Sequence, residues 1–156
     1  MDVTAIRELV DRQAITDLIY AYCYHFDRNE PELVAALFTA DALVDYGPEA
    51  ETIVGASAIA STIAVGLERT FAATSHHVSN VRLTFEGPDE ASGTTYVYAW
   101  HRYRDGSPDG ELWAQYHHRF VRTAAGWRIS ALVLKAAGMN NFHRAAMHPI
   151  GRHEAS

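Results

Sequence analysis

The sequence has almost no cysteine or lysine and no long apolar run. Cys23 is the single cysteine and Lys135 the single lysine among 156 residues. One cysteine excludes a disulfide framework within the chain and is typical of a reducing compartment. No apolar run approaches the roughly 18 residues that a membrane-spanning helix needs, and the first residues lack the apolar core of a signal peptide. We therefore expect a cytoplasmic protein without a membrane partner.

Clustered positive charge is also missing. Lysine and arginine total 13 against 19 acidic residues, so the formal net charge is −6. Nucleic-acid binding needs a clustered cationic face, so we expect no nucleic-acid partner. Glycine and proline number only 10 and 5, and 48% of the residues are hydrophobic. This composition is typical of one folded domain that buries its own core.

Histidine, in contrast, is plentiful, with nine residues. Its ordinary pKa lies nearest neutrality of all side chains, which suits it to act as a general base. Solvation or subunit contact is the simpler explanation for the three that lie in the C-terminal tail, which are His143, His148 and His153.

Helical periodicity dominates the N-terminal part of the chain. Apolar residues recur every three or four positions from Ile15 to about Arg28. Pro31 stands where a first-turn proline starts another helix, and Gly47-Pro48 ends a short strand. The pattern is helical from Asp2 to about Arg28, where a short helix over Val3–Val10 is expected to precede the helix that carries the apolar stripe. The other elements expected here are helices over Glu32–Phe38 and Gly55–Leu67, and one strand over Ala42–Tyr46.

After Ala73 the pattern changes to β-branched and aromatic runs that are separated by short, turn-rich breaks. Helices followed by an antiparallel meander indicate the α+β class. We expect one domain over residues 1–140, in which helices cross the concave face of a curved antiparallel sheet and leave a pocket between the two layers. The four expected strands are His76–Phe85, Ala91–Arg104, Glu111–Arg122 and Trp127–Ala137.

Asp27 is a carboxylate on the apolar stripe of the first long helix, because it continues the series of positions 15, 19, 23 and 27. A buried carboxylate is costly unless a partner compensates its charge. Either Asp27 ends this helix or caps the next one, or it orients a catalytic base.

Two adjacent histidines, His76 and His77, begin the first long strand. A strand start opens toward the rim or interior of a cone-shaped domain, where an imidazole can meet a carboxylate carried by a helix. Asp27 would then orient the ring and stabilise its charged form while the ring abstracts a proton from the substrate. The alternative is a pair of exposed strand histidines.

Five further residues could line the same cavity, although each has a default explanation as a packing residue. His101 lies on a half-buried strand face, and Tyr46 ends a strand where its phenol could donate to a substrate oxygen. Tyr116 and His118 share one face of the third long strand. Trp100 could stack on a ring-shaped substrate, but core packing or a subunit contact explains it equally well.

Metal and nucleotide sites are not expected. Neighbouring residues point to opposite faces of a strand, so neither His76-His77 nor His117-His118 can chelate one ion. The sequence has no H-E-x-x-H, no zinc-type Cys/His spacing, no glycine-rich phosphate loop and no G-x-S-x-G. We expect a site without metal or cofactor that acts on a small molecule.

Taken together, five segments resemble SnoaL-like proteins of the NTF2-like superfamily, over roughly residues 5 to 140. Within that superfamily the resemblance is closest to the group of scytalone dehydratase, hexachlorocyclohexane dehydrochlorinase and bile-acid dehydratase. It implies a cone-shaped α+β domain. The segments are Phe26-Asp27-Arg28, Val44-Asp45-Tyr46, Ser75-His76-His77-Val78-Ser79-Asn80, His101-Arg102-Tyr103 and Gly126-Trp127-Arg128.

The resemblance implies roles for four residues. Asp27 and His76 fall on the carboxylate–histidine pair of that group, and His76 stands four residues before Asn80, as the dehydrochlorinase motif requires. Tyr46 falls on a tyrosine that holds a water against the substrate carbonyl in scytalone dehydratase. His101 falls on the second active-site histidine of that enzyme.

Two departures change what the site would recognise. Scytalone dehydratase has a second water-holding tyrosine where this chain has Phe26, and a pocket asparagine where Tyr116 stands. The expected pocket also includes Tyr22 of the same helix. It therefore keeps the acid–base pair but not the groups that recognise a naphthol-type substrate.

Strict alternation along the first long strand conflicts with the motif. It places His77, and not His76, on the side of the apolar Val81 and Leu83. A bulge near Val78, or a core on the other side of the sheet, would turn His76 inward instead.

Three functions fit this scaffold: a cofactor-independent lyase of the dehydratase type, an isomerase or polyketide cyclase, and a non-catalytic domain that binds a small ligand. The Asp27–His76 pair favours the lyase, in which the base removes a proton from a small, cyclic, apolar substrate and a leaving group such as water departs. His101 or Tyr46 would supply an acid or hold a polarising water.

The C-terminal tail, residues 141–156, is expected to form an arm over a neighbouring subunit or a lid over the pocket. The relatives imply a homo-oligomer, with a trimer favoured and a dimer as the alternative.

Overall fold

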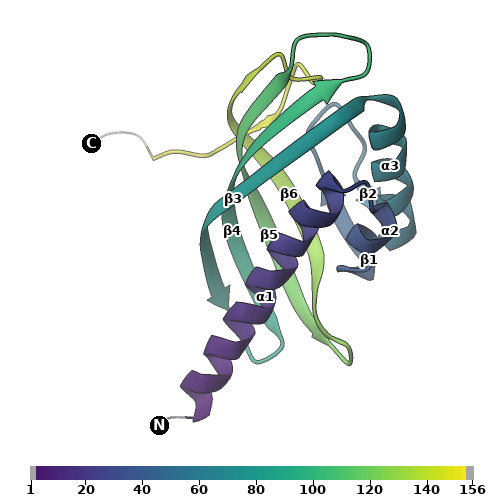
Figure 1. Ribbon diagram of the computed structural model, residues 1–156. Coiled ribbons are helices and arrows are strands. Elements are labelled where there is room, and N and C mark those ends of the chain that lie inside the picture. Colours follow the sequence, from purple (N-terminus) through teal and green to yellow (C-terminus); the bar gives the residue numbers. More distant parts are fainter. Residues whose placement is uncertain (1–2, 154–156) are drawn as a thin grey trace.

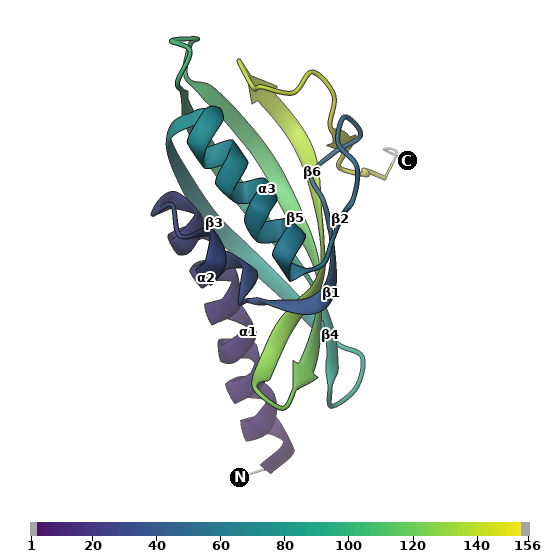
Figure 2. The same cartoon turned by 90° about the vertical axis from the view of Figure 1, so that its right-hand side faces the viewer.

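Residues 3–153, which the computed structural model describes, fold as three helices laid against one face of a curved, seven-stranded sheet (Figures 1 and 2). This arrangement confirms the α+β class. The helices and strands are α1 (Val3–Asp27), α2 (Pro31–Ala35), β1 (Phe38–Asp45), β2 (Ile53–Val54), α3 (Ala56–Arg69), β3 (Phe71–Phe85), β4 (Glu90–Tyr103), β5 (Gly110–Thr123), β6 (Gly126–Asn140) and β7 (His148–Pro149).

The sheet is mixed, whereas the sequence predicted an antiparallel one. Its strand order is β2-β1-β6-β5-β4-β3, with β7 paired to β6. The four long strands β3 to β6 form the predicted antiparallel meander. However, β1 and β7 both run parallel to β6. Short strands of this kind carry too little periodicity to reveal their direction, and only β1 was expected at all.

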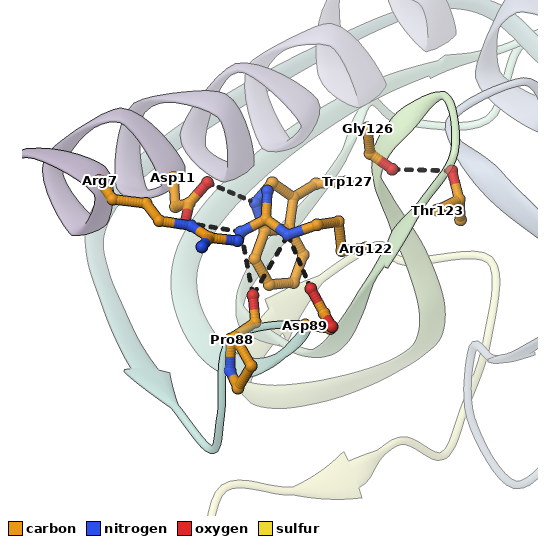
Figure 3. Close-up of polar contacts among 8 residues, drawn as sticks. All are labelled: Arg7, Asp11, Pro88, Asp89, Arg122, Thr123, Gly126 and Trp127. Carbon is orange, nitrogen blue, oxygen red and sulfur yellow. Dashed lines mark hydrogen bonds and ion pairs between the residues drawn. The ribbon is translucent and has the colours of Figure 1, made fainter. Parts of the chain in front are cut away.

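Helix α1 is continuous from Val3 to Asp27, so the prediction of a separate helix over Val3–Val10 is wrong. Asp11, at the expected break, is 8% exposed. Its carboxylate accepts hydrogen bonds from Arg122 at 2.6 Å and from the Trp127 indole at 3.0 Å (Figure 3). These partners lower the pKa of Asp11, the hydrogen bond from Arg122 most. Because its charge is compensated, the acidic residue continues the buried face of the helix.

The core lies between the helices and the concave face of the sheet (Figure 2). The apolar stripe predicted on the first helix is buried there, with Ile15 at 0% and Ile19 at 1% exposure. From the sheet, Phe120, Ile129 and Leu132 complete the fully buried centre. None of the helices within residues 3–153 has the length and apolar character needed to cross a membrane.

Candidate active site

A cavity of about 280 Å³ opens between the sheet and the ends of α1 and α3. Its wall is mostly apolar or aromatic, and histidines and tyrosines provide most of its polar groups. A cavity of this size fits a ligand of one or two rings, near the lower end of typical small-molecule sites. The lining residues used below are Tyr22, Phe26, Tyr46, Phe71, His76, His101, Tyr116, Phe142, His143 and Arg144.

Asp27 is the last residue of α1, and its carboxylate accepts three hydrogen bonds. Helix α1 ends here because Asn29 adopts a φ of 60°, the left-handed conformation that terminates helices. Oδ1 accepts from Thr74 at 2.8 Å and contacts His76 Nδ1 at 2.6 Å, while Oδ2 accepts from the His76 backbone N–H at 2.8 Å. The contact between Asp27 and His76 therefore exists as the motif predicted.

The charge state of Asp27 follows from this geometry. Burial alone would raise the pKa of Asp27, but the hydrogen bonds from His76, the charge that its ring carries when protonated, and the hydrogen bond from Thr74 outweigh burial and hold the pKa below its usual value. A carboxylate can only accept, so we assign the His76 ring proton to Nδ1. In the neutral ring, Nε2 is then the nitrogen with a free lone pair.

A bulge in β3 turns His76 toward the cavity. His76 and Val78 pair with Ala99 and Val97 of β4, but the register shifts by one residue between Ser79 and Arg82. Asn80, within the shift, has a φ of 52°, a conformation that asparagine tolerates better than most residues. From Thr74 to Val78 the even-numbered residues face inward, and from Val81 to Phe85 the odd-numbered ones do.

This bulge resolves the conflict between alternation and motif. His77 points away from the cavity, where its Nε2 lies 3.0 Å from Ser75 Oγ. Strict alternation failed because it assumed an uninterrupted strand. The spacing of four residues between His76 and Asn80 thus has a physical basis in the fold, since Asn80 marks the point at which the strand changes face.

Two tyrosines meet inside the cavity. The hydroxyl oxygens of Tyr22 and Tyr46 lie 2.7 Å apart, and either can donate. Burial raises the pKa of Tyr46 to about 12 and that of Tyr22 well above its usual value, so both phenols stay protonated. Phe26 has no hydroxyl, but the second one comes from Tyr22, one helical turn earlier. Tyr22 was predicted in the pocket, but its pairing with Tyr46 was not.

His101 lines the cavity as a neutral ring. Its ring centroid lies 5.6 Å from that of His76 and 4.9 Å from that of Phe71. Burial lowers the pKa of His101 to about 3, and the nearby His76 and His143 act in the same direction. Because His101 is neutral, the carboxylate of Asp27 is the group that balances a positive charge on the His76 ring.

Tyr116 lines the cavity as expected and packs edge-on against Tyr22, with ring centroids 5.5 Å apart. Two other predicted pocket residues do not line it. His118 lies deeper in the core, against Phe120. Trp100 is on the opposite face of β4, where Arg102 covers its ring at 5.0 Å. Alternation places Trp100 outside because its neighbour His101 faces inward.

Two contributions to the site were not predicted from the sequence. Thr74, two residues before His76, shares the inward face and binds Asp27, which alternation along β3 could have indicated. Phe142, His143 and Arg144 of the C-terminal tail also line the cavity. The tail was expected as an arm or a lid, but it has no periodicity that would identify these residues.

Within residues 3–153, no group of three or more His, Cys, Asp or Glu side chains is arranged to hold a metal ion. The cluster at the cavity instead combines the Asp27–His76 pair, the neutral imidazole of His101 and phenols. Such a set can remove a proton from a carbon atom and can hydrogen-bond a substrate oxygen.

Comparisons with known proteins identify the family and the fold. The SnoaL-like domain matches residues 7–133. The structure of a candidate scytalone dehydratase from Novosphingobium aromaticivorans DSM 12444 is similar with 36% identity and a TM-score of 0.89, over 96% of this chain and 99% of that one. A candidate aromatic ring hydroxylase from Novosphingobium aromaticivorans is similar with 25% identity and a TM-score of 0.79, over 85% and 93% of the two chains.

A third structure, hexachlorocyclohexane dehydrochlorinase from Novosphingobium barchaimii LL02, shares the fold. Its identity is 20% and its TM-score 0.80, over 95% of this chain and 99% of that one. No curated protein matches the sequence.

Proposed function

This chain belongs to the SnoaL-like family, and we propose that within it the protein is a cofactor-independent lyase that eliminates water from a small cyclic substrate. The observation that carries the proposal is the 2.6 Å contact between Asp27 and His76 Nδ1 at the wall of a mostly apolar cavity. That contact leaves Nε2 of His76 as the base.

The reaction begins with a proton on the carbon next to a substrate carbonyl. Nε2 of His76 takes this proton, and the C–H electron pair becomes the new carbon–carbon double bond. Asp27 stabilises the imidazolium that forms, since its lowered pKa keeps it ionised. The imidazolium then returns the proton to the departing hydroxyl group, which leaves as water and restores the neutral base.

The tyrosine pair polarises the carbonyl. One of the two phenols donates to the other, and the remaining hydroxyl proton is free to donate to the substrate oxygen as negative charge develops on it. Their raised pKa values make them hydrogen-bond donors rather than proton-transfer groups. In this mechanism His76 transfers the proton, and Tyr22 and Tyr46 stabilise the negative charge on the substrate oxygen.

Two of the similar structures have names that fit such chemistry, because a dehydratase and a dehydrochlorinase both remove a proton and expel a leaving group. Fold alone does not fix the reaction, as the candidate hydroxylase with the same fold illustrates. The site itself therefore carries the argument.

An isomerase is the second candidate, and one observation favours it. His76 is the only group we assign to proton transfer, and a single base that returns its proton to another carbon completes an isomerisation. Product mass separates the two reactions, because elimination loses water and isomerisation conserves the mass.

The test uses ring-sized hydroxyketones, with products followed by mass spectrometry. His76→Ala should lower kcat by about 10²–10⁴-fold, the usual contribution of a general base. His77→Ala is the matched control, since this neighbouring histidine points away from the cavity. Equal activity of the His76→Ala variant and the wild type would refute the assignment.

Homo-oligomerisation remains a prediction. The outer face of the sheet exposes Tyr96 and Trp113, at 47% and 42%, which agrees with a face that contacts another subunit. Light scattering on the purified protein distinguishes a monomer, a dimer and a trimer directly.

A further inference from the structure

The charge inside the cavity is limited to one side chain. Of the described residues that line it, only Arg144 carries a permanent charge. Arg144 is half-buried and belongs to the tail segment after β6. A guanidinium beside an apolar cavity is unfavourable unless an anion or a hydrogen-bond acceptor compensates its charge. The partners of Arg144 therefore indicate which ligand the cavity binds.

No hydrogen bond or ion pair to the Arg144 side chain is found within residues 3–153. The two carboxylates that contact its segment are occupied by other groups. Glu49 accepts the backbone N–H groups of Ala145 and Ala146, each at about 3 Å. Asp45 contacts His148 Nε2 at 2.9 Å and also accepts the N–H of Gly47. The guanidinium therefore remains available to a ligand.

These same contacts hold Arg144 in place. Glu49 fixes the backbone directly after it, and His148 joins the segment to β1 through Asp45. Farther along, β7 pairs with β6. Arg144 is thus presented by an anchored segment, which limits the entropy lost when it binds a ligand.

Arg144 also lies within electrostatic reach of the proposed reaction site. Burial dominates the pKa of Tyr46 and raises it, while the charge of Arg144 acts in the opposite direction. The guanidinium and the Tyr22–Tyr46 pair therefore line one continuous cavity with His76. Arg144 is the one permanently charged residue among the described residues that line it, and the ionised Asp27 lies behind His76, outside the lining.

We propose that the substrate is a ring-sized carboxylic acid whose carboxylate binds Arg144 while the ring lies between His76 and Tyr46. This inference rests on the proposed function for the position of the reacting carbon. A carboxylate matches the planar, two-pronged donor geometry of a guanidinium, and one such group neutralises the single charge. The net charge of −6 does not attract anions to the protein in general, so their binding depends on this local cation.

The experiment measures binding and needs no turnover. 2-Naphthoate and its neutral isostere 2-naphthamide are titrated into the purified protein by calorimetry, and the histidine ring signals in NMR locate each ligand next to His76 and His101. We expect naphthoate to bind about tenfold or more tightly than naphthamide, which is the range for a hydrogen bond to a charged group.

Arg144→Met should remove this preference, and Arg144→Lys should retain part of it. Arg7→Met is the matched control, because it removes the same charge from the exposed first turns of α1 and should leave the preference unchanged. Equal binding of the two ligands to the wild type, or a preference that survives Arg144→Met, overturns the proposal.

The titration of His76→Ala, together with the turnover assay on hydroxyketones described above, separates this inference from the proposed function. His76→Ala should retain the preference for naphthoate even though its kcat falls. Loss of turnover in His76→Ala with no preference for the acid would refute the substrate class alone. A preference for the acid together with full turnover in His76→Ala would refute the lyase mechanism alone.

Discussion

Replacing His118 by leucine should make the folded protein less sensitive to acid. His118 is 3% exposed and stacks on Phe120, with 5.2 Å between the ring centroids. Neither of its ring nitrogens has a hydrogen-bond partner within residues 3–153. Burial lowers the pKa of His118 from 6.5 to about 3, with a smaller effect from the neighbouring His117. The ring is therefore neutral in the folded protein throughout the mildly acidic range.

The sign of the effect follows from which state binds the proton. Below pH 6.5 the unfolded chain protonates His118, whereas the folded chain does so only near pH 3. The unfolded state binds more protons in this window, so stability falls as the pH falls. One pKa unit corresponds to about 1.4 kcal/mol. Acidification from about pH 7.5 to about pH 5 should therefore cost about 2 kcal/mol through His118 alone.

Urea unfolding at both pH values, at one protein concentration, measures this term. The wild type should lose about 2 kcal/mol more free energy of unfolding between the two pH values than His118→Leu does. Any packing change that leucine causes is present at both pH values and cancels in the difference. The exposed His77→Gln should behave as the wild type. Equal losses in His118→Leu and the wild type would show that His118 is not held neutral in the core.

Three further substitutions test other parts of the structure. Asp11→Ala leaves the Trp127 indole N–H without its acceptor and removes one acceptor of Arg122, which keeps Asp89 and the Pro88 carbonyl. It should cost about 2 kcal/mol in urea unfolding; an effect below the error of the measurement would refute a stabilising network. Asn80→Ala forces alanine into a left-handed conformation and should cost about 1 kcal/mol, whereas Asn80→Gly should not. Thr74→Val removes one hydrogen bond to Asp27 and should lower kcat about fivefold while leaving KM unchanged, since Thr74 does not line the cavity.

Much of the fold could be predicted because its signals are periodic. The apolar stripe on α1 and the four long strands of the meander each repeat over many residues, and the structure confirms them. The continuity of α1 could not be predicted, since it depends on Arg122 and Trp127, which lie more than a hundred positions from Asp11. The parallel direction of β1 was equally hidden, because direction is set by the path of the chain through space, and β7 was not predicted at all.

The candidate site, too, could be predicted only in part. The contact between Asp27 and His76 was predictable from a motif, although its catalytic role remains a prediction. The inward orientation of His76 was not, because the bulge at Asn80 is a local backbone conformation that no alternation pattern contains. Trp100 was placed in the pocket in error, since both faces of β4 carry aromatic residues and composition cannot distinguish them.

The separation between the base and the groups that contact the substrate suggests how such a site changes its specificity. Asp27 and His76 are fixed by a helix end and a bulged strand, both part of the packed core. Tyr22 supplies a hydroxyl that the resemblance placed one turn later, at Phe26, and Arg144 lies on a tail outside the meander. We expect substitutions of Tyr22 or Arg144 to alter what the cavity binds without moving His76. A shared dyad is therefore weak evidence for a shared substrate, and we expect the cavity-lining residues of α1 and the tail to determine which substrate binds.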